Sequence, residues 1–310
     1  DLSEAKISDA SLVGATFKNS NLTSVNAQRS DFSETDLRDA NLTRARFDSS
    51  DFMNSNMKSS VLTQTGLYKA DLTGVDVSYS TFDRTNIQEA DLTEANLTGS
   101  IFTDVVGTHI KLDGADLTGV ALIRSRFDRT TFNDADLTGV DLSESNLSGS
   151  KFVGAKQTDW TLWPSPISPS SLGVEQREMR NPDLICDLTS INDCSGVDLN
   201  HTDMSSRKLQ NTRLISTNLT GSDLVEVDMT GAFAPGALFT GVRLEGSKLK
   251  AADLSGANFV GAKLRNADLS TAKLANADLR GADLRGVDIR GANISTTLLD
   301  GVQWQGATAD

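Results

Sequence analysis

The sequence contains few of the residues that usually carry enzyme chemistry. It has two histidines, two cysteines, two tyrosines and five prolines among 310 residues, and aromatic residues make up 5%. So few histidines and cysteines exclude most zinc sites and most histidine-dependent catalysis. No apolar run approaches the ~18–20 residues of a membrane-spanning helix. No secretory or transit segment is recognisable. We therefore expect no membrane segment, while both a cytoplasmic and an extracytoplasmic location stay open.

Hydrophobic residues are also scarce, but they recur at a fixed interval. They amount to 38% of the chain, below the roughly 45–50% of ordinary globular proteins. From Leu2 to Phe152 every fifth residue is large and apolar except Ala27 and Gly107. The same period runs from Leu199 to Trp304. Two residues before each large residue lies a small one, and the residue between them is often Asp or Asn.

A period of five fits neither an amphipathic helix nor a simple alternating strand. It requires a chain that turns every five residues and places one large and one small side chain inward each time. Glycine recurs two residues after the large position, as at Gly14, Gly74 and Gly99, and suits corners with unusual dihedral angles. The pattern predicts an all-β solenoid whose coils pair through their backbones.

The repeated motif resembles a known family. ADLTG at 115–119 and 135–139, ADLRG at 282–286 and ANLTG at 95–99 are similar to the A(D/N)LXX consensus of pentapeptide-repeat proteins. The resemblance implies a right-handed quadrilateral parallel β-helix with four pentapeptides per coil and about 13 coils. Phenylalanines spaced by one such coil support this: Phe32/Phe52, Phe82/Phe102, Phe132/Phe152 and Phe239/Phe259.

Two exceptions test the proposed register. Gly107 leaves room in the large column, and Ile110 is an oversized residue in the small column nearby. In the same way, Ala27 is a small residue in the large column, and Val25, two residues before it, is a larger residue in the small column. These changes indicate volume exchange within a narrow core, although simple decay of the repeat is an equal alternative.

The period divides the chain into three parts: repeat block 1 over 1–156, a Trp/Pro-rich loop insertion over 157–195, and repeat block 2 over 196–310. The insertion holds four of the five prolines, and a short helix is expected near 174–179. We favour one continuous solenoid that bears this loop, with two solenoids meeting at an angle as the alternative. The first residues are already in register without a cap, so we expect a fragment of a longer protein.

Candidate chemical sites are few. His109 and His201 stand alone in the pattern, and no phosphate loop, zinc motif or calcium loop is present. We expect no enzyme activity, no cofactor and no bound metal. Cys186 and Cys194 lie in the insertion, where they either form a disulfide that staples the loop or remain two buried thiols.

Outward apolar residues mark candidate interaction surfaces. Val61, Ile101 and Ala121 are expected to point outward on one face, with Ile123 beside them, and to form an exposed apolar strip, or else a seat for the loop. The pair Phe233 and Leu238 replaces the usual Asp or Asn, unless the register slips around Pro235. The loop tryptophans, Trp160 and Trp163, complete the set.

The net charge of −13 favours two function classes. It comprises −8 in residues 1–157, −4 in 158–194 and −1 in 195–310. We expect a non-catalytic structural or protein-interaction scaffold that is a monomer and binds an unidentified protein. The alternative is an acidic DNA mimic that regulates or protects a type II topoisomerase, as some members of the resembled family do. Direct nucleic-acid binding is not expected, because it requires cationic side chains that neutralise phosphate.

Overall fold

Each pentapeptide forms one short extended step followed by one tight turn. The repeat at Asp91 shows the pattern: Leu92 donates its backbone N–H to the carbonyl of Lys111 at 2.8 Å, and Ala95 donates back to the carbonyl of Leu92 at 3.1 Å. The second hydrogen bond closes a four-residue turn, and Glu94 within it has a φ of 58°. A positive φ at the third turn position is the signature of a type II turn. The predicted corner glycines confirm this, since Gly14, for example, has a φ of 66°.

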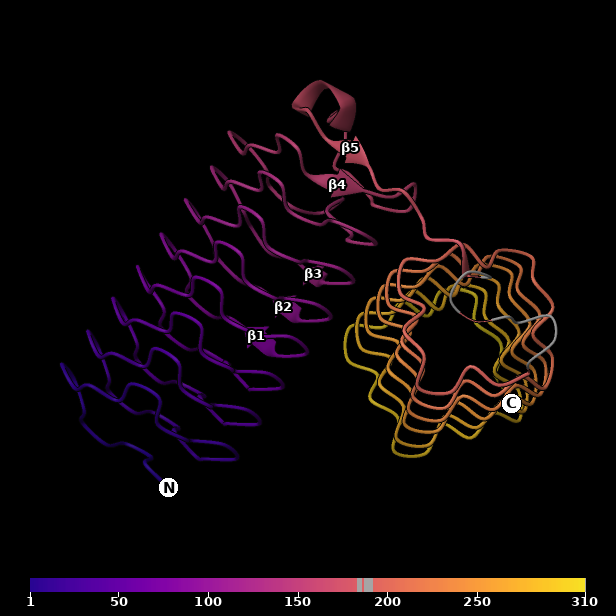
Figure 1. The fold of residues 1–310 in the computed structure, drawn as a ribbon, viewed down its shortest axis with the longest axis horizontal. Coiled ribbons are helices and arrows are strands. Elements are labelled where there is room, and N and C mark those ends of the chain that lie inside the picture. The colour runs from indigo at the N-terminus through magenta and orange to yellow at the C-terminus, as the bar shows by residue number, and fades with distance from the viewer. Residues whose placement is uncertain (183–185, 187–191, 310) are drawn as a thin grey trace. The chain divides into compact units, whose positions relative to one another are not determined.

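Parallel pairing between residues 20 apart holds successive coils together. Most contacts are single bridges, such as Asp71 to Asp91 and Asp91 to Lys111. A short sheet forms where the pairing lengthens: β1 (Thr81–Asp83), β2 (Ile101–Thr103) and β3 (Ala121–Ile123) pair in register (Figure 1). Four pentapeptides therefore make one coil.

The computed structural model describes residues 1–182, 186 and 192–309. The chain forms two compact units, Asp1–Gln176 and Arg177–Asp310. Each unit is a stack of coils (Figure 1) with its own apolar core. No helix among these described residues is long and apolar enough to cross a membrane.

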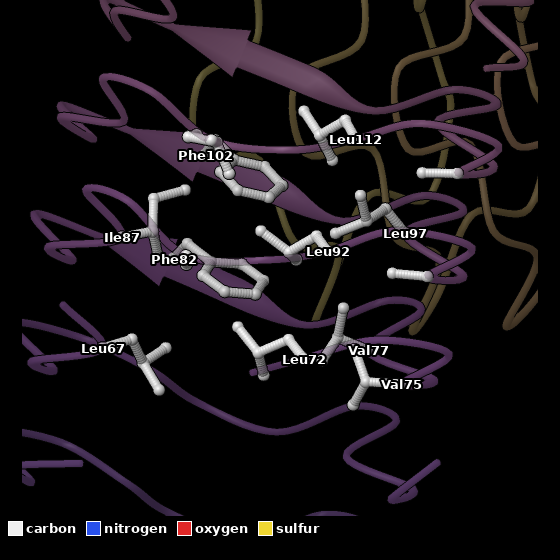
Figure 2. Close-up of a cluster of buried hydrophobic side chains, with 14 of the residues drawn as sticks. Leu67, Leu72, Val75, Val77, Phe82, Ile87, Leu92, Leu97, Phe102 and Leu112 are labelled. Atoms are coloured by element: carbon white, nitrogen blue, oxygen red, sulfur yellow. The ribbon is translucent and has the colours of Figure 1, made fainter. Parts of the chain in front are cut away.

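The large residues of each repeat fill the interior in columns. Figure 2 shows Leu72, Leu92 and Leu112 one above another, with Phe82 beneath Phe102 in a neighbouring column. Phe82 and Phe102 stack with ring centroids 4.4 Å apart and planes 4° from parallel. The other predicted phenylalanine pairs also stack, at 4.6 to 5.1 Å. The predicted inward register is thus confirmed.

Gly107 provides the space that Ile110 occupies. A Cβ atom at Gly107 would lie 2.2 Å from Cδ1 of Ile110 and 3.2 Å from Cγ1 of Ile87. Separations this short require the side chain of Ile110 or Ile87 to shift, so glycine is the residue that fits this position without rearrangement. The predicted exchange of volume between the two columns is confirmed at this position.

The residues after the first block close one end of the first unit. β4 (Lys156–Gln157) pairs with β5 (Glu175–Gln176), and a four-residue 3-10 helix, Pro169–Leu172, lies between them. The helix expected near 174–179 is therefore wrong. Pro169 starts the helical turn earlier, and Gly173, with a φ of 77°, ends it before β5.

Candidate interaction surfaces

The Asp or Asn that precedes each core residue holds the following turn. Asp91 accepts the backbone N–H of Thr93 at 3.1 Å and its hydroxyl at 2.6 Å. Lys111, one coil further on, places its Nζ 2.7 Å from the same carboxylate. Burial opposes ionisation of Asp91, but the hydrogen bonds from Lys111 and Thr93 outweigh it and lower the pKa of the carboxyl. These carboxylates are structural caps as well as surface charges.

Opposite charges also pair along the faces of the coils. Asp9 receives two hydrogen bonds from Arg29, both of 2.7 Å, and Asp104 is held in the same way by Arg124. Asp36 pairs with Arg38 within one repeat, and its hydrogen bond from Arg38 lowers the pKa of Asp36 to about 2. Such exposed pairs contribute little stability individually, but they fix the directions of side chains that would otherwise be mobile.

One row of the first unit is acidic. Asp31, Asp51, Asp71 and Asp91 pair in succession along the stack, and Lys111 follows them. Each of the four accepts the backbone N–H of the residue two positions ahead. The sequence analysis counted these carboxylates as part of the net charge and did not identify their hydrogen bonds within the turns. The Asp/Asn-x-Ser/Thr spacing was the available signal, because these residues favour side-chain-closed turns.

The predicted apolar strip is only partly exposed. Val61 is 40% exposed, but Ile101 is 5% exposed and Ile123 is half-buried. Part of the reason is the sheet itself, because Ile101 lies in the central strand β2 with Thr81 and Ala121 in register on either side. The expectation that Ile101 and Ala121 are exposed residues is wrong, because both are buried.

The two loop tryptophans pack at the end of the first unit. Trp163 meets Phe152 edge to face, with centroids 5.0 Å apart, and donates its indole N–H to Oε1 of Gln157 at 2.7 Å. Trp160 is 7% exposed. A tryptophan that fills a core and satisfies its N–H in this way is a packing residue. The expectation of an exposed surface is wrong for Trp160, which is buried, whereas Trp163 is half-buried and keeps part of its surface exposed.

The second predicted patch does face outward. Phe233 is 37% exposed and bridges Arg213 and Asp253, while Leu238 is half-buried between Asn218 and Asn258. No register slip occurs, because Gly236 keeps the regular turn with a φ of 66°.

Its neighbours extend this patch. Pro235 and Ile215 are half-buried on adjacent coils, which join where Ser216 donates its N–H to the carbonyl of Pro235 at 3.0 Å. The guanidinium carbon of Arg213 lies 5.3 Å from the centre of the Phe233 ring. We call Ile215, Phe233, Pro235 and Leu238 the Phe233 patch. It is an apolar surface with a cation beside its aromatic ring.

The remaining predicted site residues have no common site. Cys186 and Cys194 form a disulfide with Cα atoms 6.1 Å apart. His109 and His201 both occupy positive-φ turn positions, in different units. Across 1–182, 186 and 192–309, no group of three or more His, Cys, Asp or Glu side chains could hold a metal ion.

Comparison with known proteins finds the repeat throughout both units. Eight copies of the family described as pentapeptide repeats match residues 1–39, 20–58, 30–67, 67–104, 110–155, 193–233, 237–274 and 262–301. No curated protein sequence matches.

The comparison with solved structures finds several pentapeptide repeat proteins. HetL of the cyanobacterium Nostoc sp. strain PCC 7120, a pentapeptide repeat protein involved in heterocyst differentiation regulation, is 23% identical over 92% of this chain and 90% of its own, with a TM-score of 0.28. Rfr23 of the cyanobacterium Cyanothece 51142 is 23% identical over 38% and 92%, with a TM-score of 0.24. QnrB1, a plasmid-mediated fluoroquinolone resistance protein, is 13% identical over 99% and 94%, with a TM-score of 0.24.

Proposed function

Because this chain belongs to the pentapeptide-repeat family, we propose that it is a non-catalytic scaffold whose outer faces bind another protein. The observation that carries the proposal is the Phe233 patch, where Phe233 and Leu238 stand in positions that the repeat gives most often to Asp or Asn. Aromatic residues beside an arginine are the common energetic centres of protein interfaces. The partner is therefore a protein, and the scaffold itself is a monomer.

Most carboxyl groups with a shifted pKa are in a state that supports a non-catalytic role, whereas burial raises the pKa of Asp223 and of Glu245, both of which lie beside Arg243. General acids near neutral pH need a raised pKa, which burial supplies. In this protein the hydrogen bond from Arg38 lowers the pKa of Asp36, and the hydrogen bond from Arg290 lowers that of Asp288, in both cases to about 2. Such groups stay ionised and hold turns. We therefore assign them no part in proton transfer, cofactor binding or metal binding.

We further propose the family geometry for the coils: right-handed, four-sided and about 13 in number, with repeat blocks over 1–156 and 196–310 joined by the segment 157–195. The coil period of 20 residues supports the four sides. The backbone of each coil is satisfied by its neighbours, so the faces are stiff and present side chains at regular intervals. Stiff, extended faces suit a scaffold.

The DNA-mimic alternative rests on the acidic row from Asp31 to Asp91. Two observations disfavour it. Cations interrupt the faces, since Lys111 neutralises Asp91 and Arg124 neutralises Asp104. The charge of the second block, −1, also gives only half of the chain an acidic surface. We expect neither inhibition nor protection of a type II topoisomerase and no direct binding to nucleic acid.

Two experiments separate these functions. Wild-type protein and the Phe233→Asn variant serve as baits in an extract of the source organism, and the captured protein is then purified and titrated against both. Asn fits this position because Asp or Asn is usual there, so the variant folds normally. Loss of at least about tenfold in affinity supports the scaffold. Potent, salt-sensitive inhibition of gyrase supercoiling by stoichiometric protein would establish the mimic instead.

A further inference from the structure

One row of outward side chains in the second unit has an ordered sequence of charges. This row, the Phe233 row, takes one residue from each of five successive coils: Asp193, Arg213, Phe233, Asp253 and Lys273. Paired strands lie about 4.8 Å apart, so the row is about 19 Å long. One coil from Phe233, the base Arg213 on one side matches the acid Asp253 on the other. Two coils away, the acid Asp193 matches the base Lys273. The row is therefore complementary in charge to its own reverse.

The Phe233 row is exposed to solvent. The side chains of Arg213 and Lys273 are at least half exposed, and the ring of Phe233 is exposed as well. The next outward row on the same face follows two residues later in each repeat and contains no charged residue. Its members are Ser195, Ile215, Pro235, Ser255 and Ala275. The charges that a partner meets on these two rows are therefore those of the Phe233 row alone.

We propose that the Phe233 patch binds a second copy of this chain, with the two stacks antiparallel and Phe233 facing Phe233 of the second copy. This inference rests on the proposed function and names the protein that the patch binds; the monomer is then the form in which the patch is unoccupied. Arg213 faces Asp253 of the second copy, and Asp193 faces Lys273 of the second copy. Because a twofold axis relates the copies, each of these contacts occurs twice.

The ion pairs within one chain prepare this contact. Nε of Arg213 lies 3.2 Å from Oδ2 of Asp193, and Nζ of Lys273 lies 3.2 Å from Oδ2 of Asp253. When one pair meets the other pair of the second copy, the four groups form a closed ring of alternating charges. A single exposed pair contributes little, whereas such a network contributes more. The two networks flank the apolar contact of the Phe233 rings.

Every other register of the two rows places like charges opposite each other. In a parallel arrangement each residue of the row faces its own copy, so Arg213 faces Arg213. An antiparallel shift by one coil sets Asp193 against Asp253 in one direction, or Arg213 against Lys273 in the other. A shift by two coils sets Arg213 against Arg213, or Asp253 against Asp253. Juxtaposed like charges suppress wrong pairings, so the charges select the register that is centred on Phe233.

The spacing of the row favours a second stack of coils over an extended peptide. Residues on one side of an extended strand are about 6.6–6.8 Å apart, so such a strand falls out of step with a row that repeats every 4.8 Å or so. A second copy carries the same spacing and the complementary order of charges. It is therefore the occupant that matches the row along its whole length.

Sedimentation equilibrium of the purified full-length protein tests the pairing. Wild-type protein should form dimers in proportion to its concentration. Arg213→Glu and Asp253→Lys should each weaken self-association by at least about tenfold, because each change sets like charges opposite each other at two places. A mixture of the two variants has opposite charges at both places again, so it should associate within about threefold of the wild-type affinity. Association of the mixture also shows that both variants are folded.

Two controls make the result specific to this register. Arg124→Glu removes an equivalent exposed pair with Asp104 in the first unit and should leave self-association unchanged. Asp193→Lys mixed with Arg213→Glu should not restore association, because Asp193 faces Lys273 of the second copy and not residue 213.

Three results would overturn the proposal. One is wild-type protein that stays monomeric at about 0.1 mM, which excludes a dissociation constant in the micromolar range. Another is unchanged self-association of Arg213→Glu, which means that the Phe233 row lies outside the contact. The third is a mixture of Arg213→Glu and Asp253→Lys that does not associate, which excludes the antiparallel register. If a different protein is captured from the extract through Phe233 while the purified chain stays monomeric, the proposed function stands and this inference alone fails.

Discussion

The substitution Gly107→Ala tests the packing account most quantitatively. The new methyl group would lie 2.2 Å from Cδ1 of Ile110, which is itself 1% exposed. Overpacking of this kind costs about 1–3 kcal/mol. Gly107 does not have a positive φ, so alanine brings no backbone penalty and recovers about 0.4–1 kcal/mol of unfolded-state entropy. The expected net loss is about 1–2 kcal/mol.

A double-mutant cycle isolates the contact. Ile110→Val removes the methyl group that would clash and by itself costs about 0.5–1.5 kcal/mol. In the Gly107→Ala/Ile110→Val variant the two changes relieve each other, so the double loss should fall short of the sum by about 1 kcal/mol or more. Urea unfolding followed by tryptophan fluorescence measures this in a Trp304→Phe background, where the remaining tryptophans lie within the first unit. Additive losses would refute the volume exchange and favour simple decay of the repeat.

Three further predictions concern the repeat itself. Leu92→Asp places an unpaired charge in the core and should lower the free energy of unfolding by well over about 3 kcal/mol. Asp91→Ala removes one cap and should lower it by about 1 kcal/mol. Equal shifts of the two variants in thermal melts would show that the inward register is wrong. Gly256→Ala should destabilise the second unit and Thr271→Gly should stabilise it, by about 1 kcal/mol each, because both positions have a positive φ. No atom lies within 4 Å of a Cβ at Gly256, so the effect there comes from the backbone and not from a clash. Calorimetry measures both changes in stability, and opposite signs would contradict the turn assignment. The hydrogen bond from Arg38 lowers the pKa of Asp36 from 3.8 to about 2. The stability that ionised Asp36 contributes is therefore present above about pH 4 and disappears as the pH falls toward 2. In the Asp36→Asn variant the free energy of unfolding should depend less on pH between about 4 and 2, and an unchanged pH dependence would contradict the pairing.

The inward half of this structure was predictable from the sequence because it is periodic. One large and one small residue in every five determine which side chains point inward, and the coil of four repeats implied by the family resemblance predicted the stack of Phe82 on Phe102. The space at Gly107 was one of two interpretations, and the structure favours it over simple decay of the repeat. A core this narrow tolerates few alternatives.

The outward half was not predictable to the same degree. The carboxylate of Asp91 has the same chemistry whether it faces water or closes a turn, and only coordinates show its bonds to Thr93. Ile101 was placed correctly in the outward column, but its burial depends on strand neighbours one coil away on either side. Isoleucine at that position was a usable signal for a longer strand, since β-branched residues favour extended pairing.

The segment between the blocks shows the limit of periodic reasoning. Once the period stops, composition indicates packing but not which surface is packed. The sequence analysis placed Trp163 on a candidate interaction surface, whereas its edge-to-face contact with Phe152 makes it a half-buried packing residue at the end of the first unit's core. The division between units at 176 and 177 likewise follows from contacts on each side and not from any break in composition.

Site-specific cross-linking tests the central claim, protein binding through the Phe233 patch, most directly. A photoreactive amino acid replaces Phe233 in one variant and Val153, which is 65% exposed in the first unit, in a matched control. Both are irradiated in living cells of the source organism. The account predicts a single prominent protein adduct at position 233 that is absent at 153. No adduct at 233, or the same adducts at both positions, would contradict it.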